Sequence, residues 1–285
     1  MRMNEPEDRY FESNRLNLHY VVWGDESKPA VVLVHGGRDH ARSWDFVAQA
    51  LLDRYCVYAI DLRGHGDSDW AIGSQYRASD HVADLSKLLD VLDRDPVQIV
   101  AHSMGGRVTL DMSGAFPERI HKLVIIEGFG WQTRPDNTPG QRLAGLVRAI
   151  RDVEGRKVHP YPTLDDAVER MADANKRLSP EMARHLTVHA VRRREDGAYV
   201  WKFDNFMRVR ALSDFAFEEA KELWAGITAP ILVISGSDTH LPMSIRQEFA
   251  DVLQNARLVT VQDAGHWVHH DQLDQFLTLT RDFLD

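Results

Sequence analysis

Short apolar runs alternate with longer amphipathic stretches along most of this chain, and this alternation constrains the fold more than any other feature. The apolar runs lie at 30–34, 57–60, 99–101, 123–127, 231–234 and 257–261. Continuous apolar strands separated by amphipathic helices are typical of a parallel sheet whose two faces are both covered. We therefore expect an α/β protein. An alternating segment near the start, up to residue 23, predicts an antiparallel pair of strands that leads into the sheet.

The alternation stops after residue 127. From 131 to 224 the sequence predicts helices separated by proline and glycine, with a hairpin around Gly197. Ser179 before Pro180 has the pattern of a helix start, and Thr163 before an acidic pair gives a similar signal. This block interrupts the repeating core.

The stretch 99–106 predicts a nucleophile. Its apolar strand leads directly into Ser103, and a glycine follows two positions later. Where a strand turns sharply into a helix, the residue at the apex takes a strained backbone conformation that leaves room only for small neighbours. Ala101 and Gly105 meet this condition on either side of Ser103. The pattern A-x-S-x-G departs by one methyl group from the usual G-x-S-x-G, and alone it also fits a helix N-cap serine.

A serine hydroxyl is a weak nucleophile at neutral pH, so a base must take its proton and a carboxylate must orient that base. His266 follows a glycine in the loop after the last apolar run, which makes it the candidate base. Two acids end apolar runs of their own. Asp238 comes shortly after the run 231–234, and Glu127 ends the run 123–127.

Serine, acid and histidine in this order, each at the end of an apolar run, resemble the pattern of the α/β-hydrolase superfamily. The glycine-marked turns at 35–37 and 61–68 match that family in register. The resemblance implies an α/β-hydrolase fold, with a mostly parallel eight-stranded sheet covered by helices on both faces. It also implies a helical cap, residues 131–224, inserted after the sixth strand of a core formed by residues 1–130 and 225–285.

The resemblance further implies roles for single residues. The family takes its acid from a G-x-D pattern followed by proline, which makes Asp238 the expected acid; some branches use the sixth strand, which leaves Glu127 as the alternative. Backbone amides of Gly37 and Met104 are the expected oxyanion hole, where each donor contributes about 3 kcal/mol. The expected substrate pocket is aromatic and is formed by Phe129, Trp131, Phe206 and Trp267.

These expectations describe a carboxylesterase-type serine hydrolase that cleaves carboxylic esters of small, largely apolar substrates through an acyl-enzyme. A C–C bond hydrolase of ring-cleavage dienoates is the first alternative, because it shares the fold, the triad, the cap and a tryptophan after the histidine. That group has asparagine before the nucleophile, where this chain has His102, and an H-G-G-G-P segment that this chain lacks. Dehalogenases and epoxide hydrolases need aspartate in place of Ser103. A non-enzymatic ligand receptor with the same fold is the second alternative.

Composition narrows the partners of this 285-residue chain. Its formal net charge of −9 argues against binding to a nucleic-acid backbone, which requires a basic surface. No run approaches the roughly 20 apolar residues of a membrane span, and a single cysteine, Cys56, excludes an intrachain disulfide. We expect a cytoplasmic monomer or homodimer that needs no cofactor. We also expect no metal, because no H-E-x-x-H or comparable ligand spacing is present.

Overall fold

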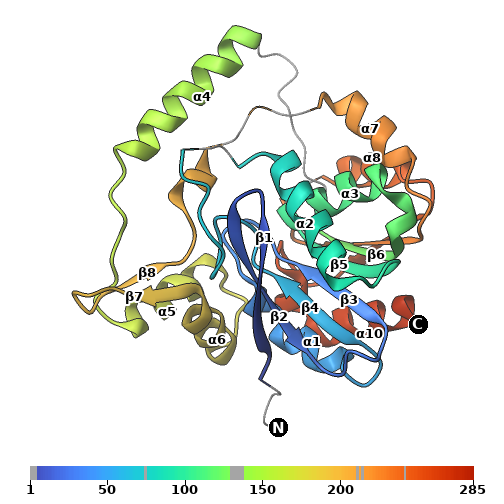
Figure 1. Ribbon diagram of the computed structural model, residues 1–285, viewed down its shortest axis with the longest axis horizontal. Helices are drawn as coiled ribbons and strands as arrows, with labels where there is room; N and C mark the ends of the chain where they lie inside the picture. The colour runs from blue at the N-terminus through green and yellow to red at the C-terminus, as the bar shows by residue number, and fades with distance from the viewer. Residues whose placement is uncertain (1–4, 74–75, 129–137, 210–211, 213–214, 241) are drawn as a thin grey trace.

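An eight-stranded sheet forms the centre of the molecule (Figure 1). The computed structural model describes residues 5–73, 76–128, 138–209, 212, 215–240 and 242–285. In spatial order, the strands are β1 (Glu7–Ser13), β2 (Leu16–Trp23), β4 (Cys56–Ile60), β3 (Ala30–Val34), β5 (Val97–His102), β6 (Ile120–Ile126), β9 (Ile231–Gly236) and β10 (Ala256–Val261). β2 runs antiparallel to both β1 and β4, and every other pair is parallel. The predicted fold class is confirmed.

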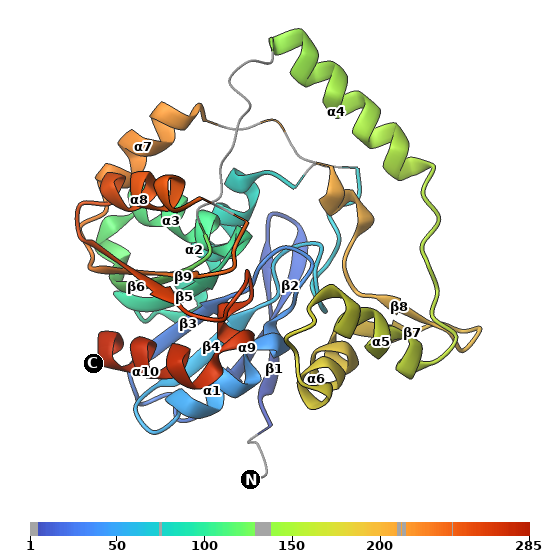
Figure 2. The ribbon, with the colours of Figure 1, turned by 180° about the vertical axis from the view of Figure 1, so that it is seen from behind.

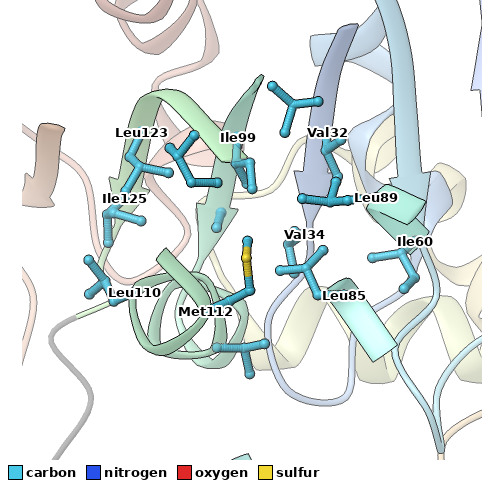
Figure 3. Close-up of a cluster of buried hydrophobic side chains, with 14 of the residues drawn as sticks. Val32, Val34, Ile60, Leu85, Leu89, Ile99, Leu110, Met112, Leu123 and Ile125 are labelled. Atoms are coloured by element: carbon cyan, nitrogen blue, oxygen red, sulfur yellow. The ribbon is translucent and has the colours of Figure 1, made fainter. Parts of the chain in front are cut away.

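Helices cover both faces of the sheet, because successive strand side chains point in opposite directions. Val32 and Val34 of β3 face a core shared with α2 (Ala78–Leu92), α3 (Met104–Ala115), α7 (Phe217–Ala225) and α8 (Met243–Val252) (Figure 3). Val31 and Leu33 face the opposite core, with α1 (Asp45–Leu51), α9 (Val268–Asp271) and α10 (Leu273–Leu284) (Figure 2). Burial of each Val or Leu side chain stabilises the fold by about 1.5–3 kcal/mol. The two cores together therefore hold the strands, and the loops at their carboxyl ends, in place.

The segment between β6 and β9 contains further elements. They are α4 (Pro139–Glu154), α5 (Leu164–Ala174), α6 (Pro180–Ala190), a two-stranded hairpin of β7 (Val191–Arg193) and β8 (Tyr199–Trp201), and the short 3-10 helix η3 (Asn205–Arg208). The hydroxyl of Thr163 caps α5, and that of Ser179 caps α6, as predicted. Gly197, at φ +87°, turns the predicted hairpin. Both ribbon views show α4 standing apart from the body of the molecule (Figures 1 and 2).

The helix α6 joins this segment to the core. His40 precedes the 3-10 helix η1 (Ala41–Trp44), and its Nε2 donates to the carbonyl of Leu186 at 3.0 Å. None of the helices in the described parts of the chain has the length and apolar character needed to cross a bilayer.

The position of helix α7 differs from the predicted boundary between cap and core. It falls within the expected cap, yet it packs on α3 of the core. Trp224 is 1 % exposed, and its indole N–H donates to Asp111 Oδ1 at 2.8 Å. The reason is close approach, because a Cβ at Gly114 would lie 2.5 Å from the carbonyl oxygen of Leu223. By its packing, 217–224 therefore belongs to the core.

Candidate active site

Ser103 occupies a strained turn between β5 and α3, at φ +51° and ψ −115°. The glycine two positions later permits this geometry. A Cβ at Gly105 would lie 2.4 Å from the carbonyl oxygen of His35, and no backbone shift of that size is cheap. The loop after β3 also approaches closely, since a Cβ at Gly36 would lie 3.2 Å from Ser103 Cβ. The backbone thus holds the hydroxyl at the carboxyl edge of the sheet.

Ser103, His266 and Glu127 form a continuous chain of polar contacts. Ser103 Oγ lies 2.9 Å from His266 Nε2. On the other side of the ring, His266 Nδ1 lies 3.3 Å from Glu127 Oε2. The three residues come from the ends of β5, β10 and β6, which meet at one edge because these strands run parallel.

Glu127 is buried and held by neutral donors. Its side chain is 0 % exposed. Oε1 accepts from Ser235 Oγ at 2.8 Å and from the Gly236 N–H at 3.0 Å, while Oε2 accepts from Thr239 Oγ1 at 2.6 Å. Burial alone would raise the pKa of Glu127, but these hydrogen bonds and the one from His266 together hold its pKa below the ordinary value. Glu127 is therefore an anion at neutral pH.

Asp238 makes no hydrogen bond to His266, although both residues line one cavity, so the expected contact between acid and base is not the one observed. Its Oδ2 accepts from an Arg177 guanidinium nitrogen at 2.6 Å, and its side chain is 47 % exposed. Its Oδ1 accepts from Ser237 Oγ at 2.9 Å. The physical reason is the position of Arg177 in the loop between α5 and α6, which attracts the carboxylate. Glu127, the alternative acid, takes the place next to His266.

A neighbouring imidazole fixes the main chain at His266. His102 Nε2 lies 2.9 Å from the His266 carbonyl oxygen, so this nitrogen must donate. Burial, and then the proximity of His266, lower the pKa of His102 well below the ordinary range, so the ring is neutral. The sequence did not predict this role for His102, because the hydrogen bond joins two segments far apart in the chain.

The two residues expected to supply the oxyanion donors are neighbours in space. Met104 is the first residue of α3, where backbone N–H groups have no intrahelical acceptor. A Cβ at Gly37 would lie 3.7 Å from Met104 Sδ. A carbonyl oxygen attacked by Ser103 would develop its negative charge near this helix N-terminus, where the macrodipole favours an anion.

A cavity of about 250 Å³ adjoins His266. Its lining includes Trp267, together with the polar residues Arg177, Asp238 and His240. Phe206, another predicted pocket residue, does not line this cavity and packs against Leu146, Val153 and Val209. Phe129 and Trp131, the other predicted pocket residues, lie outside the described residues.

The family of this chain follows from a direct comparison. A family model described as the alpha/beta hydrolase fold matches residues 29–273. The chain belongs to this family and is a hydrolase.

Individual relatives span a range of reactions. The chain is 27 % identical over 94 % of its length to the sn-1-specific diacylglycerol lipase of Mus musculus, covering 85 % of that protein. It is 28 % identical to a 2-hydroxy-6-oxononadienedioate/2-hydroxy-6-oxononatrienedioate hydrolase of Dechloromonas aromatica, over 94 % of this chain and 91 % of that protein. An esterase of Mycobacterium tuberculosis is 26 % identical, over 92 % of this chain and 85 % of that protein. Among solved structures, the thioesterase domain from the curacin biosynthetic pathway has a TM-score of 0.87 at 21 % identity, covering 98 % of this chain and 100 % of that chain, which shows the fold.

Proposed function

We propose that this hydrolase cleaves small carboxylic esters through an acyl-enzyme, with Ser103 as nucleophile, His266 as general base and Glu127 as the orienting carboxylate. The observation that carries the proposal is the contact of 2.9 Å between Ser103 Oγ and His266 Nε2, continued by Glu127 on the far side of the ring. Nucleophile, base and orienting group within reach of one another are the geometric signature of acyl transfer.

The reaction proceeds in two halves. Ser103 Oγ attacks the ester carbonyl carbon while His266 Nε2 takes its proton, and the resulting imidazolium returns that proton to the departing alcohol. Water then attacks the acyl-enzyme by the same proton path and releases the acid. The buried anion Glu127 accepts the hydrogen bond of His266 Nδ1, which keeps Nε2 free to accept and stabilises the imidazolium in both halves.

The tetrahedral intermediates carry a negative oxygen. The N–H groups of Met104 and Gly37 are the proposed donors to it, and removal of one such donor typically costs about 3 kcal/mol. Neither position depends on the chemistry of a side chain, which suits a main-chain role.

The cavity beside His266 is lined by the proposed base but not by Ser103, so it forms one side of the proposed substrate site. At about 250 Å³ it falls slightly below the usual range for ligand sites of about 300–1,000 Å³. Its lining is mixed, with the aromatic ring of Trp267 and the charged groups of Arg177 and Asp238. This small volume and mixed lining support compact esters as the proposed substrates. The names of the lipase and esterase relatives support ester cleavage.

A C–C bond hydrolase is the second candidate. The relative in Dechloromonas aromatica favours it by name, and Trp267 follows His266 along the cavity wall. A dienoate substrate separates the two reactions, since an esterase leaves it uncleaved while it hydrolyses p-nitrophenyl esters.

The nucleophile is tested with a fluorophosphonate probe and with p-nitrophenyl acetate and butyrate. Wild-type protein should be labelled at Ser103, as located by mass spectrometry, and Ser103→Ala should lose labelling and at least about 10³-fold in turnover. Ser237→Ala is the matched control, because it removes another hydroxyl near the cavity and should still be labelled. Turnover in Ser103→Ala at the wild-type rate would overturn the proposal, and absence of labelling in folded wild-type protein would favour a receptor.

A further inference from the structure

A cluster of three potential ligands lies next to the active site and has no part in the proposed hydrolysis. Asp39, His269 and His270 each offer one ligand atom, and these atoms all lie within 4.8 Å of one another. Asp39 belongs to the loop after β3, whereas the two histidines belong to α9 near the end of the chain. The fold therefore brings together three potential metal ligands that no local sequence spacing predicts.

His269 is the buried centre of the cluster. It is 0 % exposed, and neither of its ring nitrogens has a hydrogen-bond partner among the described residues. Trp44 stacks on the ring at 4.6 Å between centroids, and the ring of His270 lies 4.0 Å away. A buried polar group without a partner costs about 1–3 kcal/mol, so an imidazole in this state is a strong candidate for a ligand atom.

The carboxyl of Asp39 lacks a positive partner. In the described part of the chain, no lysine or arginine lies within ion-pair distance of it, and its Oδ1 accepts from the His40 N–H at 2.9 Å. A bound cation would supply the missing charge.

A second group of this kind, Asp45 with His185 and His189, is less suitable. Its carboxylate is already neutralised by Arg42, whose guanidinium lies 2.8 Å from Asp45 Oδ2. His185 Nε2 also lies 3.2 Å from the same oxygen. A metal ion there would have to displace an existing ion pair, whereas the first cluster holds a buried imidazole, His269, whose ring nitrogens have no partner among the described residues.

We propose that Asp39, His269 and His270 form a binding site for a divalent transition-metal ion, with Zn²⁺ as the reference ion. Two imidazoles and one carboxylate are ligands that suit zinc, and three protein ligands leave one coordination position for water. Zinc bonds of about 2.1 Å place neighbouring ligands of a tetrahedral site about 3.4 Å apart. Side-chain rotations that move the ligand atoms by about 1 Å would bring them from within 4.8 Å of one another to that spacing.

Occupancy of this site affects the neighbouring catalytic groups, a consequence that rests on the proposed function. Asp39 lies two residues after Gly37, the proposed oxyanion donor. The ring of His269 lies 4.6 Å from that of His102, which holds the carbonyl of His266. An ion that draws Asp39 toward α9 therefore displaces both parts, and we expect it to lower ester turnover with the same midpoint as metal binding.

Binding is measured on full-length, tag-free protein treated with EDTA. Titration calorimetry with ZnCl₂ should give one site per chain, and NiCl₂ should quench tryptophan fluorescence because Trp44 stacks on His269. Asp39→Asn and His270→Gln should each weaken zinc binding at least tenfold. His189→Gln is the matched control, because it belongs to the second group, and it should bind zinc as the wild type does.

A measurement on the unaltered chain keeps the test decisive if a variant fails to fold. Diethylpyrocarbonate modifies accessible imidazoles, and Zn²⁺ should protect His270 while leaving the exposed His121 reactive, as mapped by mass spectrometry. No saturable binding, wild-type affinity in both Asp39→Asn and His270→Gln, loss in His189→Gln alone, or an unprotected His270 would each overturn the proposal. Because binding is read without substrate, failure of the esterase proposal would leave the isotherm unchanged.

Discussion

Exchange of Glu127 for glutamine tests the assignment of the acid most directly, since it changes one atom of a buried side chain. Glu127 Oε1 accepts from Ser235 Oγ and from the Gly236 N–H, so the amide oxygen of the introduced glutamine would keep this side. The amide N–H₂ then replaces Oε2 and faces His266 Nδ1. A donor at that position requires His266 Nδ1 to accept, which moves the ring proton to Nε2.

The expected loss follows from this change of tautomer. An imidazole protonated at Nε2 cannot take the proton of Ser103, and loss of the orienting carboxylate in serine proteases lowers kcat about 10⁴-fold. The contact between His266 Nδ1 and Glu127 Oε2 is 3.3 Å, longer than a strong charge-assisted hydrogen bond of about 2.7–2.9 Å. We therefore expect a smaller effect in Glu127→Gln, about 10²–10⁴-fold in kcat, or about 3–5 kcal/mol.

The assay compares kcat for p-nitrophenyl butyrate in Glu127→Gln and in Asp238→Asn. Asp238→Asn weakens an exposed ion pair with Arg177. Because exposed ion pairs contribute only about 0–1 kcal/mol to stability, the kcat of this variant should stay within about tenfold of wild type. Glu127→Asp is the second control, because it keeps the charge but shortens the reach, and it should recover part of the loss. Circular dichroism and the melting temperature report whether each variant is folded.

A larger loss of kcat in folded Asp238→Asn than in folded Glu127→Gln would refute this reasoning. That result would mean that the carboxylate of Asp238 leaves Arg177 during turnover and reaches His266.

Two further predictions concern stability and are measured by urea unfolding. Gly105→Ala places a Cβ 2.4 Å from the carbonyl oxygen of His35, so it should lower the free energy of unfolding by about 3 kcal/mol; an unchanged midpoint would show that the turn relaxes. His19 is buried; although burial opposes protonation, the hydrogen bond from His19 Nδ1 to Asp61 Oδ2 at 2.7 Å raises the pKa of His19 above its ordinary value. The contribution of His19 to stability is therefore complete below its unfolded pKa of about 6.5 and is lost as pH rises through its higher folded pKa. His19→Gln should therefore flatten the decline in stability above about pH 6.5. Identical pH slopes in wild type and variant would contradict this assignment.

The fold was predictable from the sequence because its signals are local. The run 30–34 becomes β3 without change, since a buried parallel strand is apolar at every position. The start of α6 was equally predictable, because Ser179 caps a helix through contacts within one turn. Ser103 at positive φ follows from the small residues beside it. Each of these features depends on a few neighbouring residues.

Features that depend on contacts between distant segments were not predictable in the same way. From the sequence alone, α7 is predicted to be part of an irregular insertion. Its place in the core depends on the contacts of Leu223 and Trp224 with α3. Likewise, Asp39 and His269 lie near opposite ends of the chain, and their proximity follows from the return of α9 to the edge of the sheet. No spacing rule could have paired them.

The choice between the two acids shows why the position of a carboxylate in the chain does not fix its function. β6 lies between β5 and β9, so Glu127 and Asp238 both follow strands that end at the edge where Ser103 lies. A carboxylate stabilises a transient imidazolium more strongly when it is buried and no permanent cation already pairs with it. Glu127 meets this condition, because it is fully buried and its partners besides His266 are hydroxyls and a backbone N–H. Asp238 does not, because Arg177 of the loop between α5 and α6 neutralises it at an exposed position.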